Sequence, residues 1–507
     1  MMTTVTALRL LPDDIHNREL LGYVRPAGWT NPQPAGRYNL VVIGAGTAGL
    51  VSAVGAAGLG ARVALVERHL LGGDCLNYGC VPSKALIRAA RAAANARNRG
   101  AFGVRSAGAS TVDFPRVMER MRALRASIAP NDSAARLAGL GIDVFMGQAR
   151  FVSGDAVEVN GAVLRFSRAV VATGARAAAL QIPGLSSVDY LTNESVFSLT
   201  TLPRRLVVIG AGPVGCELAQ AFARFGAEVT LVSDSARIMP REDPDAAAIV
   251  QAALERDGVT IVLGAKVTSI APAFGGEKLV RFERDGHEGA AVGDALLVAV
   301  GRAPNVEGLD LQAAGIAVDQ NGVSVTDQLR TSNRRVFAAG DVASRFKFTH
   351  AADAMARLVI QNALFFGRKK ASALVIPWAT YTDPEVAHVG LTAGDVRERP
   401  DVRTLTVPFH DVDRAILDSA TEGFGRVHAD MKGRIVGATI VAPHAGEMIG
   451  EMSLAMTAGL SLGTLARTIH PYPTQSEAWK KIGDQWNRGR LTPRVRSIFG
   501  VLMRWRR

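Results

Sequence analysis

The chain has 507 residues, of which 48% are hydrophobic and 21% are charged, and its formal net charge at pH 7 is +12. This length predicts two to four domains, and the composition is typical of a soluble globular protein. Three cysteines are too few for the disulfide framework of a secreted protein, and the N-terminus lacks a signal-peptide pattern, so we expect a cytoplasmic protein.

Residues 1–37 show no clear hydrophobic period and contain the proline-rich stretch "RPAGWTNPQPAG". We therefore expect an N-terminal extension that acts as a lead-in and contributes no core element.

A dinucleotide-binding pattern begins at Tyr38, where "YNLVVIGAGTAGL" predicts a buried strand, a glycine turn and the start of a helix. Gly44 permits the tight turn, Gly46 lets a pyrophosphate approach the backbone, and Gly49 allows close packing of helix on strand. The next predicted strand, "ARVALVER", contains Glu67, whose carboxylate can accept ribose hydroxyls. Residues 40–61 are uncharged and long enough to span a bilayer, but the positions of the glycines lead us to reject a membrane span.

The stretch "GGDCLNYGCVPSK", residues 72–84, holds two of the three cysteines. Cys75 and Cys80 can close a small ring disulfide, whereas a zinc site would need a second ligand pair that the chain lacks. Pro82 predicts that a helix starts there with Cys80 at its N-terminus, where the helix dipole stabilises a thiolate. Such a thiolate beside a nucleotide-borne ring suits electron transfer between a flavin and a disulfide, and Lys84 can add a positive charge beside the reduced flavin.

A second copy of the dinucleotide pattern spans residues 204–234, and its glycines are Gly210, Gly212 and Gly215. The strand-end position is Ser233, followed by Asp234 and then Arg237. A carboxylate at this place selects NAD and an arginine accepts the extra phosphate of NADP, so we favour NADPH and keep NADH open. The third cysteine, Cys216, is predicted to be a packed thiol beneath this turn.

Three further apolar stretches predict strands that run into small or acidic residues. They are "RAVVATGAR" with Thr173 and Gly174, "ALLVAVGRAPN", and "NRRVFAAGDVA", which presents Asp341 at its end. From about residue 374 the pattern predicts an antiparallel sheet followed by helices, which is a third domain of α+β type.

The C-terminal residues 486–507 form a basic tail in which Val495, Ile498, Phe499 and Leu502 recur at helical spacing between arginines. The favoured interpretation is a terminal helix docked on its own domain, and the alternative is a basic amphipathic helix on an anionic membrane. No nucleic-acid motif accompanies the positive charge, so a nucleic-acid partner is not expected.

The stretch that holds Cys75 and Cys80 resembles the redox-disulfide segment of the class I FAD-dependent pyridine nucleotide-disulfide oxidoreductases. This family includes dihydrolipoamide dehydrogenase, glutathione reductase and mercuric reductase, and the resemblance covers nearly all of residues 38–484. It implies an α/β fold with two Rossmann-like domains, for FAD and NAD(P), plus a C-terminal α+β domain that forms a homodimer. The boundaries it implies are 38–180 and 301–370 for the FAD-binding domain, 181–300 for the NAD(P)-binding domain, and 371–485 for the dimerisation domain.

The resemblance also implies roles for individual residues. Cys75 would meet the substrate and Cys80 would contact the flavin, while Lys84 and Glu217 would form an ion pair beside it. The other positions that it assigns to FAD are Gly73, Ala149 near the adenine, Thr173, Gly174, Asp341 at the ribityl chain, Thr349 and His350. To NAD(P)H it assigns Val267 and Gly301, besides the second glycine set, Ser233 and Arg237.

The segment "IHPYPTQSEAW" departs from the family pattern H-P-T-x-x-E, because Tyr472 stands at the histidine position while Glu477 is retained. A phenol with a pKa of about 10 is a poor proton shuttle at neutral pH. His470 lies two residues away and is not expected to substitute for the missing imidazole.

Mercuric reductases also have a tyrosine at this position, and another before the second dinucleotide unit, which Tyr190 matches. A soft metal ion held by thiolates needs no proton returned to a leaving thiol, so the change fits metal chemistry. Three features oppose it. The C-terminal cysteine pair of mercuric reductases and their N-terminal metal-binding C-x-x-C motif are both missing. Asp74 also replaces the usual threonine before Cys75, adding a negative charge that disfavours a thiolate.

We therefore expect a homodimeric, mercuric-reductase-like flavoenzyme in which NAD(P)H reduces FAD and the flavin opens the Cys75–Cys80 disulfide. The resulting dithiol, or the flavin itself, would then reduce the acceptor, which is Hg(II) or another metal or small electrophile. The acceptor would bind in a pocket completed by Tyr472 and Glu477 of the partner subunit. No resident metal is expected. The alternatives are a dihydrolipoamide dehydrogenase or other disulfide reductase, and a membrane-surface redox-sensing or binding module anchored by the tail.

Overall fold

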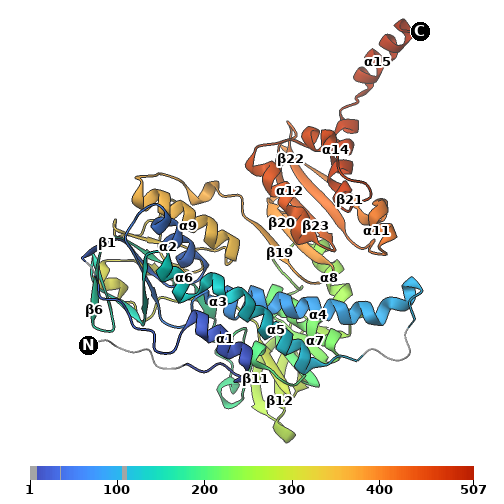
Figure 1. Ribbon diagram of the computed structural model, residues 1–507. Helices are drawn as coiled ribbons and strands as arrows, with labels where there is room; N and C mark the ends of the chain where they lie inside the picture. The colour runs from blue at the N-terminus through green and yellow to red at the C-terminus, as the bar shows by residue number, and fades with distance from the viewer. Residues whose placement is uncertain (1–7, 35, 106–110) are drawn as a thin grey trace. The chain divides into compact units, whose positions relative to one another are not determined.

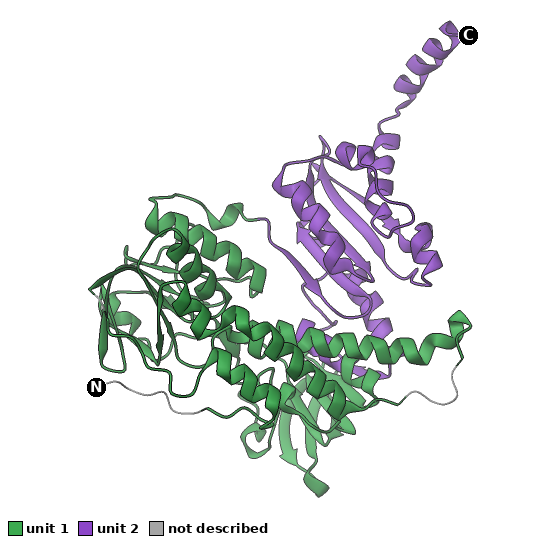
Figure 2. Cartoon of the chain, viewed as in Figure 1, with its two compact units in different colours: residues 1–210, 221–234, 265–374 green, residues 211–220, 235–264, 375–507 purple. Residues whose placement is uncertain are grey.

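The computed structural model describes residues 8–34, 36–105 and 111–507 (Figure 1). The chain divides into two compact units (Figure 2). Unit 1 comprises the residues up to 210 together with 221–234 and 265–374, and unit 2 comprises 211–220, 235–264 and 375–507.

The main sheet of unit 1 has the strand order β3-β2-β1-β6-β5-β4, and β18 pairs with β6 beside this path. Its strands are β1 (Arg37–Ile43), β2 (Val63–Glu67), β3 (Ile142–Met146), β4 (Ala149–Ser153), β5 (Ala156–Val159), β6 (Ala162–Val171) and β18 (Val336–Ala338). β1, β2, β3, β6 and β18 are parallel, so their carboxyl ends meet at one edge of the sheet. This edge is where ligands bind in open α/β sheets.

Helix α2 (Thr47–Gly58) follows β1 directly, with Gly46 at its N-cap. Residues 40–61 thus form the end of a strand, a turn and a helix, followed by the start of the next connection, as the glycine pattern predicts. Among the described residues, no helix combines the length and the apolar character needed to cross a bilayer.

The N-terminal extension contradicts the expectation that it contributes no core element. Residues 15–24 form helix α1 (Ile15–Val24), capped by Asp14 through the Asn17 amide at 2.8 Å, and Leu20 and Val24 are fully buried. α1 packs against α5 (Phe114–Ile128). Ten residues between proline-containing stretches give too few turns to show a clear helical period, which is why the pattern was indistinct.

Unit 1 also contains a smaller parallel sheet in the order β9-β8-β14, formed by the second copy of the dinucleotide pattern. These strands are β8 (Arg205–Ile209), β9 (Glu228–Val232) and β14 (Ala295–Val298). The other strands of the unit are antiparallel pairs or ladders: β7 (Ala175–Ala177), β11 (Lys266–Pro272), β12 (Lys278–Arg284), β13 (His287–Gly293), β15 (Arg302–Pro304), β16 (Val318–Asp319) and β17 (Gly322–Val323). The remaining helices are α3 (Gly73–Asn77), α4 (Cys80–Asn98), α6 (Ala134–Gly139) and α9 (Thr349–Leu364), and α7 (Pro213–Phe225) runs from unit 2 into unit 1.

Unit 2 is built on an antiparallel sheet in the order β19-β20-β23-β22-β21. Its strands are β19 (Pro377–Thr380), β20 (Glu385–Gly390), β21 (Val402–Pro408), β22 (Phe424–Asp430) and β23 (Ile435–Ala442), and β10 (Val259–Val262) also belongs to the unit. Its helices are α8 (Pro244–Arg256), α10 (Ala393–Val396), α11 (Asp413–Leu417), α12 (Ala445–Thr457), α13 (Leu462–Arg467), α14 (Glu477–Gly489) and α15 (Pro493–Trp505). The α+β organisation predicted from about residue 374 is confirmed.

The last two helices differ in packing. α14 buries Trp479, Ile482 and Trp486 in the core of unit 2, whereas α15 buries none of its side chains. The tail is helical as predicted, but the favoured interpretation that it docks on its own domain is not met. The apolar face of α14 is already used in this core.

A buried polar network connects α8 with the sheet of unit 2. Asp243, just before α8, accepts hydrogen bonds from the Ala393 amide at 2.9 Å, the Arg426 guanidinium at 3.1 Å and the Thr439 hydroxyl at 3.2 Å. Beside it, Glu242 accepts from Trp378 Nε1 at 2.7 Å and is only 5% exposed. Burial raises the pKa of Glu242 to about 7, because a buried carboxylate loses hydration.

His428 of β22 is fully buried in the same unit, and burial lowers its pKa to about 4. As the pH rises, the two groups change the free energy of unfolding in opposite directions. Glu242 stabilises the fold below pH 4.5, and this contribution is lost as the pH rises through about 7. His428 destabilises the fold at low pH, and stability is gained as the pH rises from about 4 to 6.5.

In Glu242→Gln the loss of stability caused by Glu242 disappears, so the gain of stability from His428 with rising pH should become visible. Between pH 4.5 and 7, the unfolding free energy of this variant should rise relative to the native protein by about 3 kcal/mol, since one pKa unit corresponds to about 1.4 kcal/mol. Guanidinium unfolding followed by tryptophan fluorescence at a series of pH values measures this. Glu422→Gln, at an exposed position, is the control and should track the native curve. Parallel curves for Glu242→Gln and the native protein would show that Glu242 does not titrate in this range.

Candidate redox and dinucleotide site

The two cysteines of the motif lie on consecutive helices of unit 1. Cys75 lies in α3, and Cys80 is the first residue of α4, as Pro82 predicts. Both are free thiols in the structure, and they hydrogen-bond with each other. Cys80 Sγ also lies 3.5 Å from the Thr349 hydroxyl at the start of α9. The chain therefore brings together the two sulfur atoms and one of the residues predicted to contact FAD.

The surroundings of Cys75 disfavour its thiolate. The hydrogen bond with Cys80 is the main cause of its raised pKa, burial adds to it, and the Asp74 carboxylate contributes in the same direction.

Asp74 is held by two partners. One of its oxygens accepts from Asn193 Nδ2 at 3.1 Å, and the other lies 3.0 Å from the Arg302 guanidinium. The same guanidinium lies 3.4 Å from Asp341, whose pKa is raised by burial. Arg302 therefore links the carboxylate beside the redox pair with the carboxylate predicted to bind the ribityl chain. Sequence reasoning missed Arg302, because this contact joins segments far apart in the chain.

A chain of hydrogen bonds connects the segment that holds Cys75 and Cys80 to helices α5 and α1. The Asn77 amide donates to the carbonyl oxygens of Leu71 at 3.0 Å and Gly73 at 2.8 Å, which fixes the start of α3. Arg125 of α5 donates to the Asn77 carbonyl at 2.8 Å and to the Asn17 side chain of α1 at 2.6 Å. The N-terminal extension therefore braces the segment that carries both cysteines.

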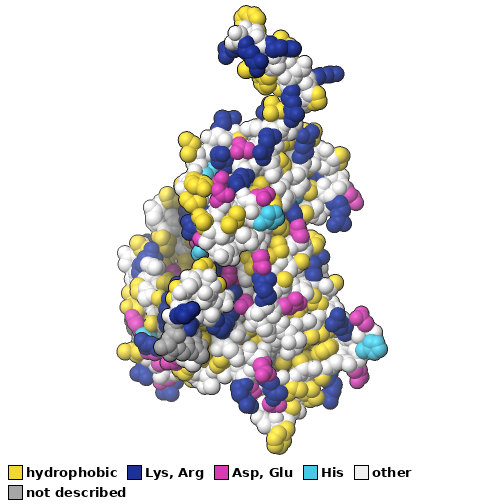
Figure 3. All heavy atoms as spheres, turned by 90° about the vertical axis from the view of Figure 1, so that its right-hand side faces the viewer, with side chains coloured by type: hydrophobic (Ala, Val, Ile, Leu, Met, Phe, Trp, Pro, Cys, Tyr) yellow, Lys and Arg dark blue, Asp and Glu magenta, His cyan; other side chains and the backbone are white. Residues whose placement is uncertain are grey.

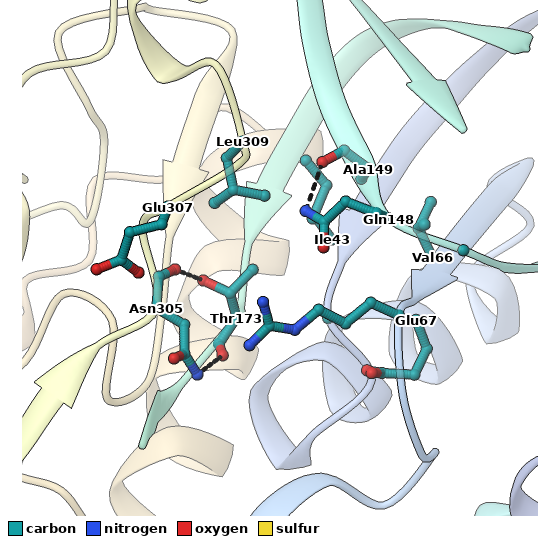
Figure 4. Close-up of a pocket in the computed structure, with 12 residues that line it drawn as sticks. Ile43, Val66, Glu67, Gln148, Ala149, Thr173, Asn305, Glu307 and Leu309 are labelled. Carbon is teal, nitrogen blue, oxygen red and sulfur yellow. Dashed lines mark hydrogen bonds between the residues drawn. The ribbon is translucent and has the colours of Figure 1, made fainter. Parts of the chain in front are cut away.

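A pocket opens at the carboxyl edge of the main sheet (Figure 4). Four of the residues predicted for FAD line it: Gly44, Glu67, Ala149 and Thr173. They come from the ends of β1, β2 and β6 and the start of β4, so the parallel topology places them together.

The turn after β1 leaves no room for side chains. A Cβ atom on Gly44 would lie 2.5 Å from the Ala172 carbonyl oxygen, and one on Gly49 would lie 1.7 Å from the Gly44 oxygen. A Cβ atom on Gly73 would lie 2.6 Å from the Gly46 Cα atom, so the glycine turn packs directly against the redox motif. Because these glycines carry no side chains, a pyrophosphate could approach the backbone amides just before the N-terminus of α2.

Glu67 is buried at the end of β2, and burial raises its pKa. Its two oxygens accept hydrogen bonds from the Ala45 and His69 amides, both at 2.7 Å. These bonds fix the carboxylate of a residue that lines the pocket, where a carboxylate can accept ribose hydroxyls.

Sequence reasoning missed several residues that line the same pocket, namely Arg68, Gln148, Asn305 and Glu307. Asn305 and Thr173 exchange two hydrogen bonds, at 2.6 and 2.9 Å, which close the pocket wall (Figure 4). The sequence signal for Asn305 is its place at the end of "ALLVAVGRAPN". The sequence predicts a strand there but does not indicate that Asn305 belongs to the FAD pocket.

The remaining residues predicted for FAD lie on unit 1 as well. Asp341 follows β18, Thr349 and His350 begin α9, and Gly174 has a φ of 69° in the turn after β6. The His350 ring stacks on Phe348 with the centroids 5.4 Å apart. Lys84 lies half-buried in the first part of α4.

The residues predicted for NAD(P)H are divided between the units. Unit 1 holds Gly210, where a Cβ atom would lie 2.7 Å from the Ala299 oxygen, and Ser233, Val267 and Gly301. Unit 2 holds Gly212, Gly215 and Arg237, and the Arg237 guanidinium donates to the Pro240 carbonyl at 2.7 Å. The choice between NADPH and NADH stays a prediction.

Two further predictions involve the start of α7. Cys216 is fully buried, donates to the Ala211 carbonyl at 3.4 Å and has a pKa raised to about 12 by burial, so the predicted packed thiol is confirmed. Glu217 accepts from the Tyr381 amide at 2.8 Å within unit 2. Its predicted ion pair with Lys84, which belongs to unit 1, stays a prediction.

The segment that departs from the family pattern lies in unit 2. The Tyr472 side chain is 71% exposed and its hydroxyl donates to Asp413 at 3.0 Å, an arrangement that raises its pKa. Glu477 begins α14, and among the described residues its buried Oε2 atom has no hydrogen-bond partner. His470 instead bonds to Glu451 at 2.9 Å. Tyr190, the other predicted tyrosine, is 39% exposed in unit 1, three residues before Asn193.

Comparison with known families decides what this arrangement is. Residues 38–356 match the family "pyridine nucleotide-disulphide oxidoreductase", and residues 376–482 match its dimerisation domain. The chain belongs to this family. It is therefore an enzyme of the flavoprotein disulfide reductase class, whose members use a redox-active disulfide, and the family implies FAD and NAD(P)H.

Three relatives illustrate the range of the family. A mercuric reductase of Bacillus cereus is 35% identical over 94% of this chain and 76% of its own length. A dihydrolipoyl dehydrogenase of Bacillus subtilis is 30% identical over 88% of this chain and 97% of its own length. The solved structure of the HOCl-induced flavoprotein disulfide reductase RclA of Escherichia coli is 30% identical, with a TM-score of 0.78. The match covers 88% of this chain and 99% of RclA. RclA has also been solved as a Cu(II) complex.

No group of three or more histidine, cysteine, aspartate or glutamate side chains that could hold a metal ion occurs in the described part of the chain.

We expect Asp74→Asn to make Cys75 more reactive. Removing this negative charge lowers the pKa of the Cys75 thiol, so alkylation of the reduced enzyme by iodoacetamide at pH 7 should become about threefold faster or more. Mass spectrometry of the labelled peptide measures the rate at Cys75. Glu119→Gln, which removes a half-buried carboxylate from α5, is the matched control. An unchanged rate in Asp74→Asn would show that Arg302 already neutralises the Asp74 charge.

Proposed function

We propose that this protein is an FAD-dependent NAD(P)H oxidoreductase that passes electrons through Cys75 and Cys80 to a soft metal ion, with Hg(II) as the first candidate. The single observation that carries the proposal is the contact between the Cys75 thiol of α3 and the Cys80 thiol at the start of α4, beside Thr349 and the glycine turn after β1. The residues around the pocket at the carboxyl edge fit the adenosine part of FAD. When bound, the flavin would supply two-electron transfer between NAD(P)H and the sulfur pair.

The roles of the chain's own residues follow from their positions. Cys75 is the thiol proposed to meet the acceptor, and Cys80 the one proposed to face the flavin. As the S–S bond re-forms, the two thiols lose two electrons and two protons, and the acceptor gains the two electrons. One Hg(II) ion would be reduced to Hg(0), or two Cu(II) ions to Cu(I). Arg302 holds Asp74 in place beside Cys75.

Tyr472 supports a metal acceptor over a disulfide. An acceptor disulfide leaves as two thiols, and each of them needs a proton, whereas a reduced metal ion needs none. The phenol of Tyr472 is bonded to the Asp413 carboxylate, which raises its pKa and makes it a still poorer shuttle near pH 7. The Cu(II) complex of RclA and the mercuric reductase relatives also favour metal ions.

The dimer completes the proposal. The match to the family's dimerisation domain supports a homodimer, in which Tyr472 and Glu477 of the partner subunit would border the acceptor pocket.

We expect Cys75→Ser to lower NAD(P)H-dependent reduction of Hg(II) or Cu(II) by about a hundredfold or more, because the hydroxyl cannot form the sulfur bridge. Anaerobic assays with each acceptor, and flavin absorbance to verify cofactor content, measure this. Cys216→Ser is the matched control, since its hydroxyl can replace the thiol in the bond to Ala211. Full turnover in Cys75→Ser would show that electrons reach the acceptor without the dithiol.

We expect Tyr472→His to create a gain of function with a different substrate. Native protein should oxidise dihydrolipoamide with NAD only slowly, and an imidazole at this position should raise that rate by about tenfold or more while leaving metal reduction unchanged. Tyr472→Phe, which removes the hydroxyl without adding a proton shuttle, should show no gain. Rapid oxidation of dihydrolipoamide by the native protein would instead favour a dihydrolipoamide dehydrogenase.

A further inference from the structure

The C-terminal helix α15 is amphipathic, and within the described part of the chain none of its side chains is buried. Among its large apolar side chains Ile498 is 66% exposed, Phe499 49% and Trp505 84%. Figure 3 shows yellow apolar and dark-blue basic side chains together on this helix. Thirteen residues at 1.5 Å each give it a length of about 20 Å.

The helix separates its apolar and basic side chains. At 100° per residue, Val495, Ile498 and Leu502 project to one side, and Arg496 and Arg504 to the opposite side. Thr492 caps the start of the helix by accepting from the Val495 amide at 3.4 Å, and Pro493 occupies the first turn. The sequence therefore specifies a helix even though the rest of unit 2 does not pack on it.

The charge of this segment identifies the surface that it fits. Residues 488–507 contain seven arginines and no acidic residue, so they hold more than half of the chain's formal net charge of +12. The remaining residues are also net positive, so a second copy of the chain offers no net negative charge to this segment. A partner must combine negative charge with an apolar layer beneath it. A bilayer that contains anionic lipids has both properties.

We propose that α15 binds the surface of an anionic membrane, with its apolar side in the interfacial layer and its arginines at the lipid phosphates. Trp505 suits this location, since its ring is apolar and its N–H remains in contact with the polar layer. The helix lies on the surface and does not cross the bilayer, because it is too short and too basic to span it. This attachment is independent of the proposed reaction.

Co-sedimentation of the full-length holoprotein with vesicles tests the proposal. We expect the protein to pellet with vesicles of phosphatidylcholine and phosphatidylglycerol in equal parts, but not with phosphatidylcholine alone. High salt should release it, because screening weakens the charge attraction. Arg496→Gln combined with Arg504→Gln should weaken binding by about tenfold or more. Arg334→Gln combined with Arg335→Gln removes two exposed arginines elsewhere and is the matched control.

A second pair of variants tests the apolar side. Ile498→Ser combined with Phe499→Ser should also release the protein from anionic vesicles, with metal-reducing activity and flavin content unchanged. On vesicle addition, tryptophan emission should shift to shorter wavelength in native protein and much less in Trp505→Phe.

Three results would overturn the proposal. The first is equal sedimentation of the native protein and both α15 variants. The second is a fall in oligomeric mass of the variants in light scattering, with no vesicle binding by the native protein, which would assign the helix to a contact between subunits. The third is binding to duplex DNA that depends on Arg496 and Arg504 but is insensitive to Ile498→Ser and Phe499→Ser, without binding to vesicles.

Discussion

The hydrogen bond between the Cys75 and Cys80 thiols is the contact on which the chemistry of this chain depends. It requires the short helix α3 to meet the start of the longer helix α4 within five residues, with Gly79 as the joint between them. A Cβ atom on Gly79 would lie 3.0 Å from the Asp74 carbonyl oxygen, so a larger residue would push the helices apart. The Asn77 side chain ties the first helix to the preceding turn. Local backbone geometry therefore places the sulfur atoms, and it does so within a single unit.

The parallel sheet of unit 1 explains why several residues distant in sequence belong to one pocket. Gly44, Glu67 and Thr173 all follow or end parallel strands, and the hydrogen-bond register brings their carboxyl ends to one edge. Sequence reasoning could place these residues because strand, turn and helix leave periodic patterns and because glycines mark the turn. The repeated dinucleotide pattern and the α+β domain were predictable for the same reason.

The remaining features depend on contacts that leave no local pattern. Arg302 contacts Asp74, and Asn305 contacts Thr173, across more than a hundred residues of sequence in each case. Neither pair could therefore be predicted from spacing. Helix α1 was missed because its core contacts, Leu20 and Val24, fill only one short face. The helical character of α15 could be predicted from its hydrophobic period. Its exposure could not be predicted, because the apolar side chains of α14 are buried in the core of unit 2 and are not available to pack against α15.

The bracing of the redox segment by α1 matters for how the protein is handled in the laboratory. The match to the oxidoreductase family begins at residue 38, so a shortened recombinant protein would naturally start there. Such a protein would lose Asn17 and leave the Arg125 guanidinium, whose pKa burial lowers to about 10, with one fewer acceptor in an apolar setting. Poor yield or weak activity of that shortened protein would then report a loosened scaffold, and would say nothing about the chemistry of the sulfur pair.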